Sequence, residues 1–383
     1  MKRSSERILT THTGSLPRPD DLAQMLYAKE KGEAVDAAAF SACVRRTVAD
    51  IVRRQAKAGV DIVNDGEMGK IGYSTYVKDR LAGLGDETGK RETLSASDFA
   101  DFPNFTQRSY SARTAPPMKR PSCNGPVSYR NVAELEHELA DFKAALAGVN
   151  TAEAFLSAAS PGVIAQFLGN HYYPTHEAYI AALADAMKTE YDAIHRAGFV
   201  LQLDCPDLAM SRHIQFASAT LEEFLKVAAL HVEALNHAIR DIPPDRVRLH
   251  LCWGNYEGPH HRDVALRDII DIVLQARVGA ISYEASNPRH EHEFKVFRDV
   301  KIPDGMILIP GVLDSTTNFI EHPEVVAMRI CNLASIVGRE NVIAGTDCGF
   351  ATFAGYSRVD PAITWAKFES MAEGARIASR ELW

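Results

Sequence analysis

The chain has 383 residues, of which 46% are apolar and 24% are charged, a composition typical of a globular protein with a large core. Its formal net charge is −8, which excludes binding to nucleic acid or to an anionic membrane through a bulk basic surface. No stretch reaches the roughly 18 apolar residues of a membrane helix, and the start carries no apolar signal segment. We therefore expect a cytoplasmic protein with neither nucleic-acid nor membrane partners.

Short β-branched runs alternate with long amphipathic patterns along most of the chain. This alternation predicts an α/β fold, a closed (β/α)8 TIM barrel that forms a single domain over residues 1–383. The expected strands are 8–13, 60–64, 162–168, 199–204, 247–252, 280–284, 306–311 and 342–346. The helical patterns between them include 36–58, 176–197, 221–240, 263–277 and 324–337.

Residues 86–130 interrupt the alternation. They are rich in Ser, Thr, Pro and charged residues and contain two aromatic pieces, 102–110 and 123–129. We interpret the segment as an insertion after the second strand, built as a β-hairpin with a loop. Long ordered insertions often serve at binding sites, so the segment is a candidate lid over the barrel mouth. A plain surface excursion is the alternative.

Polar and sulfur-bearing side chains follow the expected strands, while the strands themselves are apolar. In a parallel barrel all the strand C-termini point to one face, so these side chains are expected to converge there. The residues concerned are Ser15, Glu67, Asp204, His250, Cys252, Glu284, Asp314 and Cys348.

The His250-Leu-Cys252 stretch predicts a metal site. Alternate residues of a strand share a face, so the imidazole and the thiolate can reach the same ion. Cys348 and Glu284, at two other strand ends, can complete a tetrahedral site. Imidazole and thiolate ligands select Zn²⁺ over magnesium or calcium. A buried cysteine beside a core histidine is the alternative for the His-x-Cys pair taken alone.

The charge of this ligand set indicates what the metal is for. Two thiolates and one carboxylate bring −3 against the +2 of zinc, so the site activates water poorly. It is better suited to holding an incoming thiol as a thiolate, which is the nucleophilic form of sulfur. The chemistry therefore points to alkylation of a thiol. We expect Glu284 to be the ligand that yields its place to the substrate sulfur.

Five stretches resemble motifs of the catalytic barrel of cobalamin-independent methionine synthase: Thr13-Gly-Ser15-Leu-Pro17, Gln202-Leu-Asp204, His250-Leu-Cys252, Ser282-Tyr-Glu284-Ala-Ser286 and Gly345-Thr-Asp-Cys348-Gly349. The resemblance covers nearly the whole chain. It implies a zinc-dependent methyltransferase of methionine biosynthesis, with zinc bound by His250, Cys252, Glu284 and Cys348. It further implies that Ser15, Glu67 and Asp204 bind the amino-acid part of homocysteine.

The chain departs from the family pattern on the donor side. The family has an Asp-x-His pattern after the seventh strand, whose His assists methyl transfer from folate. Here the stretch reads Asp314-Ser315-Thr316, and the chain has room for one barrel rather than two. We predict Glu284 and Asp314 as catalytic residues and leave the donor open between a small molecule, such as a folate or an epoxide, and a corrinoid protein. The oligomeric state is also open, a homo-oligomer included.

Related single-barrel proteins suggest alternatives. Epoxyalkane:coenzyme M transferase alkylates a sulfonate thiol, whereas Glu67 and Asp204 favour a substrate with a cationic amino group. A uroporphyrinogen-decarboxylase-like enzyme shares the barrel but needs no metal. A zinc hydrolase would show a His-x-His where this chain has His12-Thr13-Gly14. A non-catalytic protein that stores zinc or binds a methyl carrier is the remaining alternative.

Overall fold

Eight parallel strands form the centre of the molecule. The structure, a computed structural model, describes residues 1–383 apart from 86–95, 112–119 and 356. The sheet order is β1-β10-β9-β8-β7-β6-β5-β2. The two outer strands also meet, because Asp61 N donates to Thr10 O over 3.1 Å and Thr11 Oγ1 donates to Ile62 O over 3.0 Å. The fold is therefore the expected (β/α)8 barrel.

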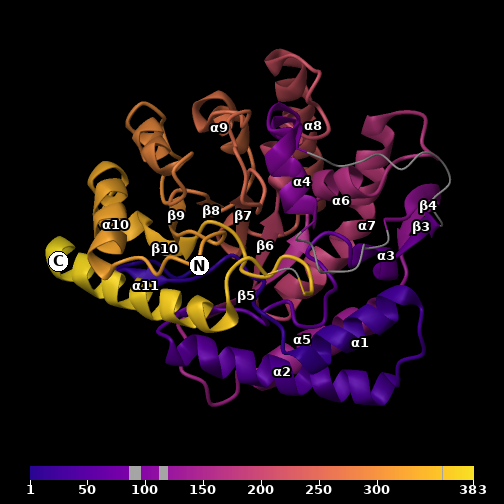
Figure 1. Cartoon of the computed structure of the whole chain (residues 1–383), viewed down its shortest axis with the longest axis horizontal. Helices are drawn as coiled ribbons and strands as arrows, with labels where there is room; N and C mark the ends of the chain where they lie inside the picture. The colour runs from indigo at the N-terminus through magenta and orange to yellow at the C-terminus, as the bar shows by residue number, and fades with distance from the viewer. Residues whose placement is uncertain (86–95, 112–119, 356) are drawn as a thin grey trace.

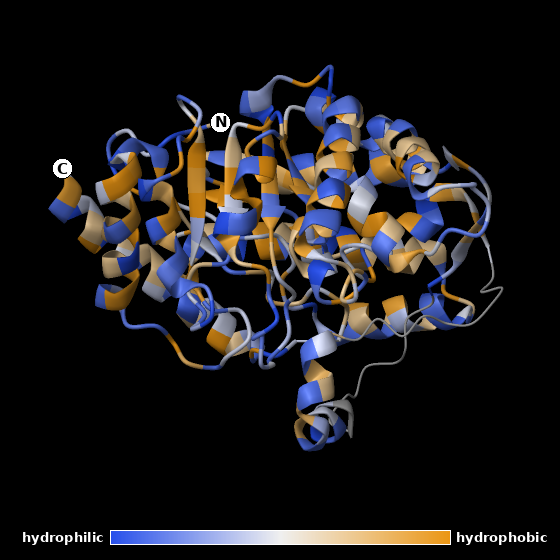
Figure 2. Cartoon of the chain, turned by 90° about the horizontal axis from the view of Figure 1, so that it is seen from above, coloured by the Kyte–Doolittle hydropathy of each residue, from blue (hydrophilic) through white to orange (hydrophobic). Residues whose placement is uncertain are grey.

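The strands are short and buried, and helices surround them (Figures 1 and 2). The strands are β1 Leu9–Thr10, β2 Ile62–Val63, β5 Glu153–Ala159, β6 Val200–Asp204, β7 Val247–Leu251, β8 Ala280–Tyr283, β9 Ile307–Leu313 and β10 Ile343–Thr346. The main helices are α1 Asp20–Lys31, α2 Ala37–Lys57, α5 Val132–Ala145, α6 Pro161–Phe167, α7 His176–Arg196, α8 Leu221–Ala238, α9 Leu266–Val273, α10 Pro323–Val337 and α11 Pro361–Leu382. No helix in the described part of the chain is both long and apolar enough to cross a membrane.

The barrel interior divides into an apolar end and a polar end. Residues near the strand starts, among them Leu9, Phe155, Val200 and Ile307, pack into one apolar cluster. Side chains at the strand ends are polar or sulfur-bearing and equally buried. In a parallel barrel the C-terminal end carries function and the N-terminal end carries stability, and this division follows that rule.

The expectation of a strand at 162–168 is wrong. That run forms helix α6, which begins where Ser160 Oγ accepts from Val163 N over 3.0 Å and Pro161 takes the first position. The third barrel strand is instead β5, which lies between β2 and β6. Periodicity cannot distinguish a short apolar helix from a buried strand. The small residues that end β5 also have weak strand propensity.

The insertion after the second strand contains a two-stranded hairpin. After helix α3 Val77–Arg80, strand β3 Leu81–Gly85 pairs antiparallel with β4 Ser122–Tyr129, so the first strand of the hairpin precedes the segment expected to hold it. Between the strands lie a 3-10 turn, η1 Ser97–Asp101, and helix α4 Pro103–Ser111. The other parts of the expected loop, 86–95 and 112–119, lie outside the described residues.

Strands β9 and β10 approach so closely at Gly311 that no larger residue fits. A Cβ there would overlap Asp347 Oδ1 and lie 2.6 Å from Asp347 N. Because backbone must move, Gly311→Ala should lower the free energy of unfolding by about 1–3 kcal/mol, measured by urea denaturation. Gly169→Ala is the control, since its Cβ would meet its nearest neighbour at 3.9 Å. Equal stability of the two variants would contradict the close approach.

Candidate metal centre and substrate site

His250, Cys252 and Cys348 come together at the C-terminal ends of β7 and β10. One ligand atom from each residue lies within 4.8 Å of the other two, and all three residues are buried. Cys348 Sγ lies 3.7 Å from His250 Nε2. His250 Nδ1 faces Ser282 Oγ at 3.3 Å, so the ring is oriented with its other nitrogen toward the sulfur.

Glu284 brings a carboxylate to the same cluster. It follows β8 directly, is buried, and places Oε1 3.7 Å from Cys348 Sγ. Oε1 accepts from Trp253 N and Oε2 accepts from Asn287 Nδ2, both over 2.7 Å. The strand ends therefore assemble the four residues that the sequence predicts as ligands.

The donor set fits a zinc ion. Tetrahedral bonds of about 2.0–2.3 Å place neighbouring ligand atoms about 3.3–3.8 Å apart, which agrees with the two 3.7 Å separations. Burial lowers the pKa of His250 to about 4, so its imidazole is neutral, as a ligand must be. The hydrogen bond between the Cys348 thiol and Cys252, together with burial, raises the pKa of Cys348. Burial and the nearby Cys252 raise the pKa of Glu284. A divalent cation would neutralise this repulsion.

The predicted substrate residues adjoin the metal ligands. Asp204 ends β6 and stands opposite His250 in the strand register. A Cβ at Gly349, the residue after Cys348, would overlap Ser15 Oγ. The Ser15 side chain therefore lies against the backbone that carries a metal ligand. All of these side chains are buried, so the two predicted groups form one continuous polar site.

Glu67 is held in an unusual backbone conformation. Its φ of 58° is left-handed, which is uncommon for a residue other than glycine and is typical of functional sites. Arg18 fixes the surrounding loop by donating to the carbonyl oxygens of Glu67, Lys70 and Ala351 over 2.8–2.9 Å. Glu67 Oε2 is buried and has no hydrogen-bond partner among the described residues. The site thus offers an unpaired acceptor to a ligand.

Burial dominates the titration of the substrate residues. It raises the pKa of Glu67 to about 7, against the effects of Lys70 and Arg18. It also raises the pKa of Asp204 to about 7, with Glu67 adding to the shift. A bound cation would lower both values, because an opposite charge favours the ionised carboxylate.

A cavity of about 220 Å³ opens beside Glu284 and Cys348, between the loops after β7, β8 and β9. Asn255, Tyr256, His260, Asn287, Arg289 and Thr316 are among its lining residues. Asp314, predicted as catalytic, lines it too, but its carboxylate is engaged within its own loop. Oδ1 accepts from Thr316 N and Thr316 Oγ1, and Oδ2 accepts from Thr317 Oγ1, each over 2.8 Å.

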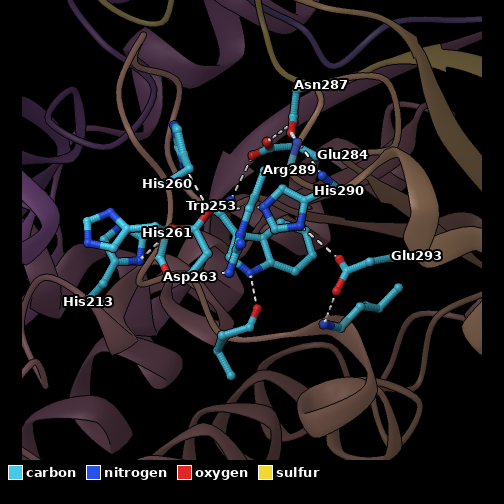
Figure 3. Close-up of polar contacts among 12 residues, drawn as sticks. His213, Trp253, His260, His261, Asp263, Glu284, Asn287, Arg289, His290 and Glu293 are labelled. Atoms are coloured by element: carbon cyan, nitrogen blue, oxygen red, sulfur yellow. Dashed lines mark hydrogen bonds and ion pairs between the residues drawn. The ribbon is translucent and has the colours of Figure 1, made fainter.

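Three histidines surround Asp263 in the loop that follows Cys252 (Figure 3). Their nitrogens lie 2.8 Å (His260 Nδ1), 3.0 Å (His290 Nε2) and 3.2 Å (His213 Nδ1) from its carboxylate oxygens. Trp253, the residue after Cys252, stacks on His290 with ring centres 4.1 Å apart. Neither Asp263 nor Trp253 was predicted as a functional residue from the sequence. The one available signal was their place in the loop that follows the His-x-Cys pair.

Residues 173–368 match the family model for the catalytic domain of cobalamin-independent synthases. The chain belongs to this family. It is 25% identical over 374 residues to a methionine synthase of Thermococcus kodakarensis, covering 97% of this chain and 94% of that protein. It is also 24% identical over 176 residues to the 2-hydroxypropyl-CoM lyase of Xanthobacter autotrophicus, covering 39% of this chain and 45% of the lyase.

The fold of this synthase-family chain also matches solved structures. A B12-independent methionine synthase from a Shewanella species, in complex with selenomethionine, superimposes with a TM-score of 0.73 and covers 98% of this chain and 99% of its own. At 18% sequence identity this likeness shows the fold alone. The site in this synthase-family chain therefore lies at the catalytic end of a shared barrel.

The raised pKa of Glu67 predicts a pH dependence of stability. Its folded value of about 7 exceeds the ordinary value of about 4.3, so this group contributes stability below about pH 4 that is lost as pH rises through 7. The variant Glu67→Gln mimics the protonated form. Between pH 5 and pH 8 its free energy of unfolding should fall less than that of the wild type, by a difference of at most about 3 kcal/mol. Urea denaturation at the two pH values measures this difference. Exposed Glu33→Gln is the control, and unchanged pH dependence in Glu67→Gln would contradict the prediction.

Proposed function

We propose that the protein is a zinc-dependent transferase that moves a methyl or alkyl group to a thiol, and that its substrate is homocysteine. The observation that carries the proposal is the convergence of two thiols, one imidazole and one carboxylate at the barrel mouth. Asp204 and Ser15 adjoin this cluster, and Glu67 acts on Asp204. Membership of the cobalamin-independent synthase family supports it over a decarboxylase-like activity. So does full-length similarity to methionine synthases.

His250, Cys252, Glu284 and Cys348 would hold the metal. Bound zinc would lower the pKa of the substrate thiol and keep its sulfur as a nucleophilic thiolate at neutral pH. The protein residues supply a neutral imidazole, sulfur ligands that preserve electron density, and a carboxylate that can be replaced. Burial of the cluster excludes competing water.

The acceptor side suits an amino-acid thiol. Glu67 Oε2 is a buried acceptor without a hydrogen-bond partner among the described residues, and Asp204 lies beside the metal ligand His250. Both carboxylates attract an ammonium group, and its arrival would lower their pKa values and ionise them. A sulfonate thiol such as coenzyme M would instead meet two acidic groups. The similarity to the coenzyme M lyase covers only part of this chain, so we rank that activity second.

We assign the alkyl donor to the cavity beside Glu284 and Cys348. The substrate thiolate attacks the donor carbon, the carbon–sulfur bond forms, and the donor leaves with the electron pair of its broken bond. Asp314 would act here by shaping the loop of Thr316 and Thr317 rather than by direct proton transfer, because its oxygens are already hydrogen-bonded. Thr316 occupies the place of the family histidine, which disfavours a folate donor.

We also propose that the described part of the insertion predicted at 86–130, residues 96–111 and 120–130, covers the donor cavity. Its described turn η1 is held by the loop after β7, since Asp98 Oδ2 accepts from Tyr256 Oη over 3.0 Å and from His260 N over 2.8 Å. Asp101 pairs with His261 over 2.8 Å and with Arg262 over 2.7 Å. Tyr256 and His260 line the cavity. The hydrogen bonds from these two residues to Asp98 therefore support a role of the insertion as a lid.

Removal of a sulfur ligand should abolish metal binding and activity together. In Cys252→Ser and in Cys348→Ser we expect zinc content to fall from about one per chain toward zero. Methionine formation should fall by more than the 10–100-fold typical of losing an outer-sphere partner. Cys331→Ser is the matched control, because Cys331 is a half-buried cysteine of α10 whose thiol faces Glu381 rather than the metal cluster. A zinc-free variant with full activity would refute the mechanism.

Zinc X-ray absorption tests the acceptor. Addition of homocysteine to the zinc-loaded protein should add one Zn–S contact and remove one Zn–O contact, because the thiol replaces Glu284. An unchanged sulfur count would exclude homocysteine and direct the search to other thiols. Protein purified without zinc, and unable to bind it, would overturn the proposal.

A further inference from the structure

The Glu284 carboxylate is bound by the protein on both of its oxygens. Trp253 N donates to Oε1 and Asn287 Nδ2 donates to Oε2, each over 2.7 Å. The residue is only 4% exposed. A buried carboxylate released from a metal is costly unless hydrogen-bond donors receive it. These two donors already stand in place.

The Asn287 amide is fixed in one orientation. Its Oδ1 accepts from Arg289 N and His290 N, both over 3.1 Å. Because that end of the amide faces two donors, Nδ2 must be the end that faces the carboxylates of Glu284 and Asp347. Asp347 Oδ2 also accepts from Asn287 N over 2.9 Å. The donor toward Glu284 is therefore held by its own backbone turn.

Trp253 is held just as firmly (Figure 3). It is fully buried, and its Nε1 donates to Val264 O over 2.6 Å. Its ring stacks on His290, whose two nitrogens face Glu293 Oε2 at 2.8 Å and Asp263 Oδ2 at 3.0 Å. Both nitrogens must donate to these carboxylates, so His290 is an imidazolium. A permanent positive charge thus lies against the ring of Trp253, next to the backbone N–H that binds Glu284.

We propose that Trp253 N and Asn287 Nδ2 form a receiving cradle for the Glu284 carboxylate, which holds it while the substrate sulfur occupies its place at the metal. Asn287 is then a positioning residue, and the cradle returns Glu284 to the metal when the product leaves. The inference rests on the proposed function. It adds the residue that makes the exchange of ligands reversible within a buried site.

The cradle favours the thiol-bound state. Hydrogen bonds to a full carboxylate charge are stronger than those to a carboxylate that shares its charge with a metal. Both donors therefore stabilise the displaced Glu284 more than the coordinated one. Loss of the Asn287 donor should weaken thiol binding more than metal binding.

The variant Asn287→Asp isolates this donor. It keeps an oxygen to accept from Arg289 N and His290 N, and it replaces Nδ2 with an oxygen that repels Glu284. In the zinc-loaded full chain we expect zinc to remain stoichiometric and the Kd for homocysteine, measured by calorimetry, to rise about 10–100-fold. X-ray absorption at saturating zinc should show a smaller gain of Zn–S contacts at equal homocysteine. If Asn287→Asp does not bind zinc, the uncharged variant Asn287→Ala is used in the same measurements.

A double-mutant cycle separates positioning from general damage. In a Glu284→Ala background no carboxylate needs receiving, so the Asn287 substitutions should leave the homocysteine Kd unchanged within about twofold. A merely structural role of Asn287 would weaken binding equally in both backgrounds and would overturn the inference. Wild-type affinity in Asn287→Asp and Asn287→Ala would overturn it too. If wild-type protein gained no Zn–S contact with homocysteine, the proposed function would fall and the inference with it.

Discussion

The Asp347 carboxylate connects the two strand ends on which the metal centre depends. Oδ1 accepts from Ala285 N and Ser286 N, and Oδ2 accepts from Asn287 N, all over 2.8–2.9 Å. Asp347 immediately precedes Cys348, and the turn that it binds immediately follows Glu284. The separation of the two predicted ligands is therefore set by three hydrogen bonds from the backbone after Glu284 to the buried side chain that precedes Cys348. The absence of a side chain at Gly311 is what lets Asp347 enter this position.

Charge compensation within the barrel extends this arrangement to the acceptor side. Arg248 is fully buried and donates to Gln202 Oε1 over 2.7 Å, and Gln202 Nε2 donates to Asp204 Oδ1 over 2.8 Å. The Arg248 guanidinium inside the barrel is thus connected to the Asp204 carboxylate through the neutral amide of Gln202. On the metal side, the His290 imidazolium stacks on Trp253, whose backbone N–H donates to Glu284. The buried carboxylates of Asp204 and Glu284 are tolerated because each is connected to a buried cation through one intervening residue.

Sequence patterns predicted the converging strand ends well, since a parallel barrel brings them together whatever the loops do. His250 and Cys252 were predictable because alternate strand residues share a face. Helix α6 was not, because a short apolar run has no diagnostic period. Asn287 and the Asp263 cluster depend on loop geometry. His213 meets Asp263 across 50 residues of sequence, and local spacing carries no information about such a contact. The roles assigned to the site residues, the metal ligands included, remain predictions.

Glu284 and Cys348 lie between two parts of the barrel mouth, the proposed binding site of the thiol acceptor and the cavity proposed for the alkyl donor. On one side, Asp204 ends β6, and Ser15 and Glu67 lie in the loops after β1 and β2. These are the residues that we propose bind the thiol acceptor. On the other side, the cavity is lined almost wholly by loop residues from 254–260, 287–289 and 314–317. Loops change without disturbing a barrel, whereas strand ends do not. One departure from the family pattern, Thr316, falls in the lining of this cavity. Under the proposed function, thiol activation depends on residues at the strand ends, and the choice of alkyl donor depends on the loops that line the cavity.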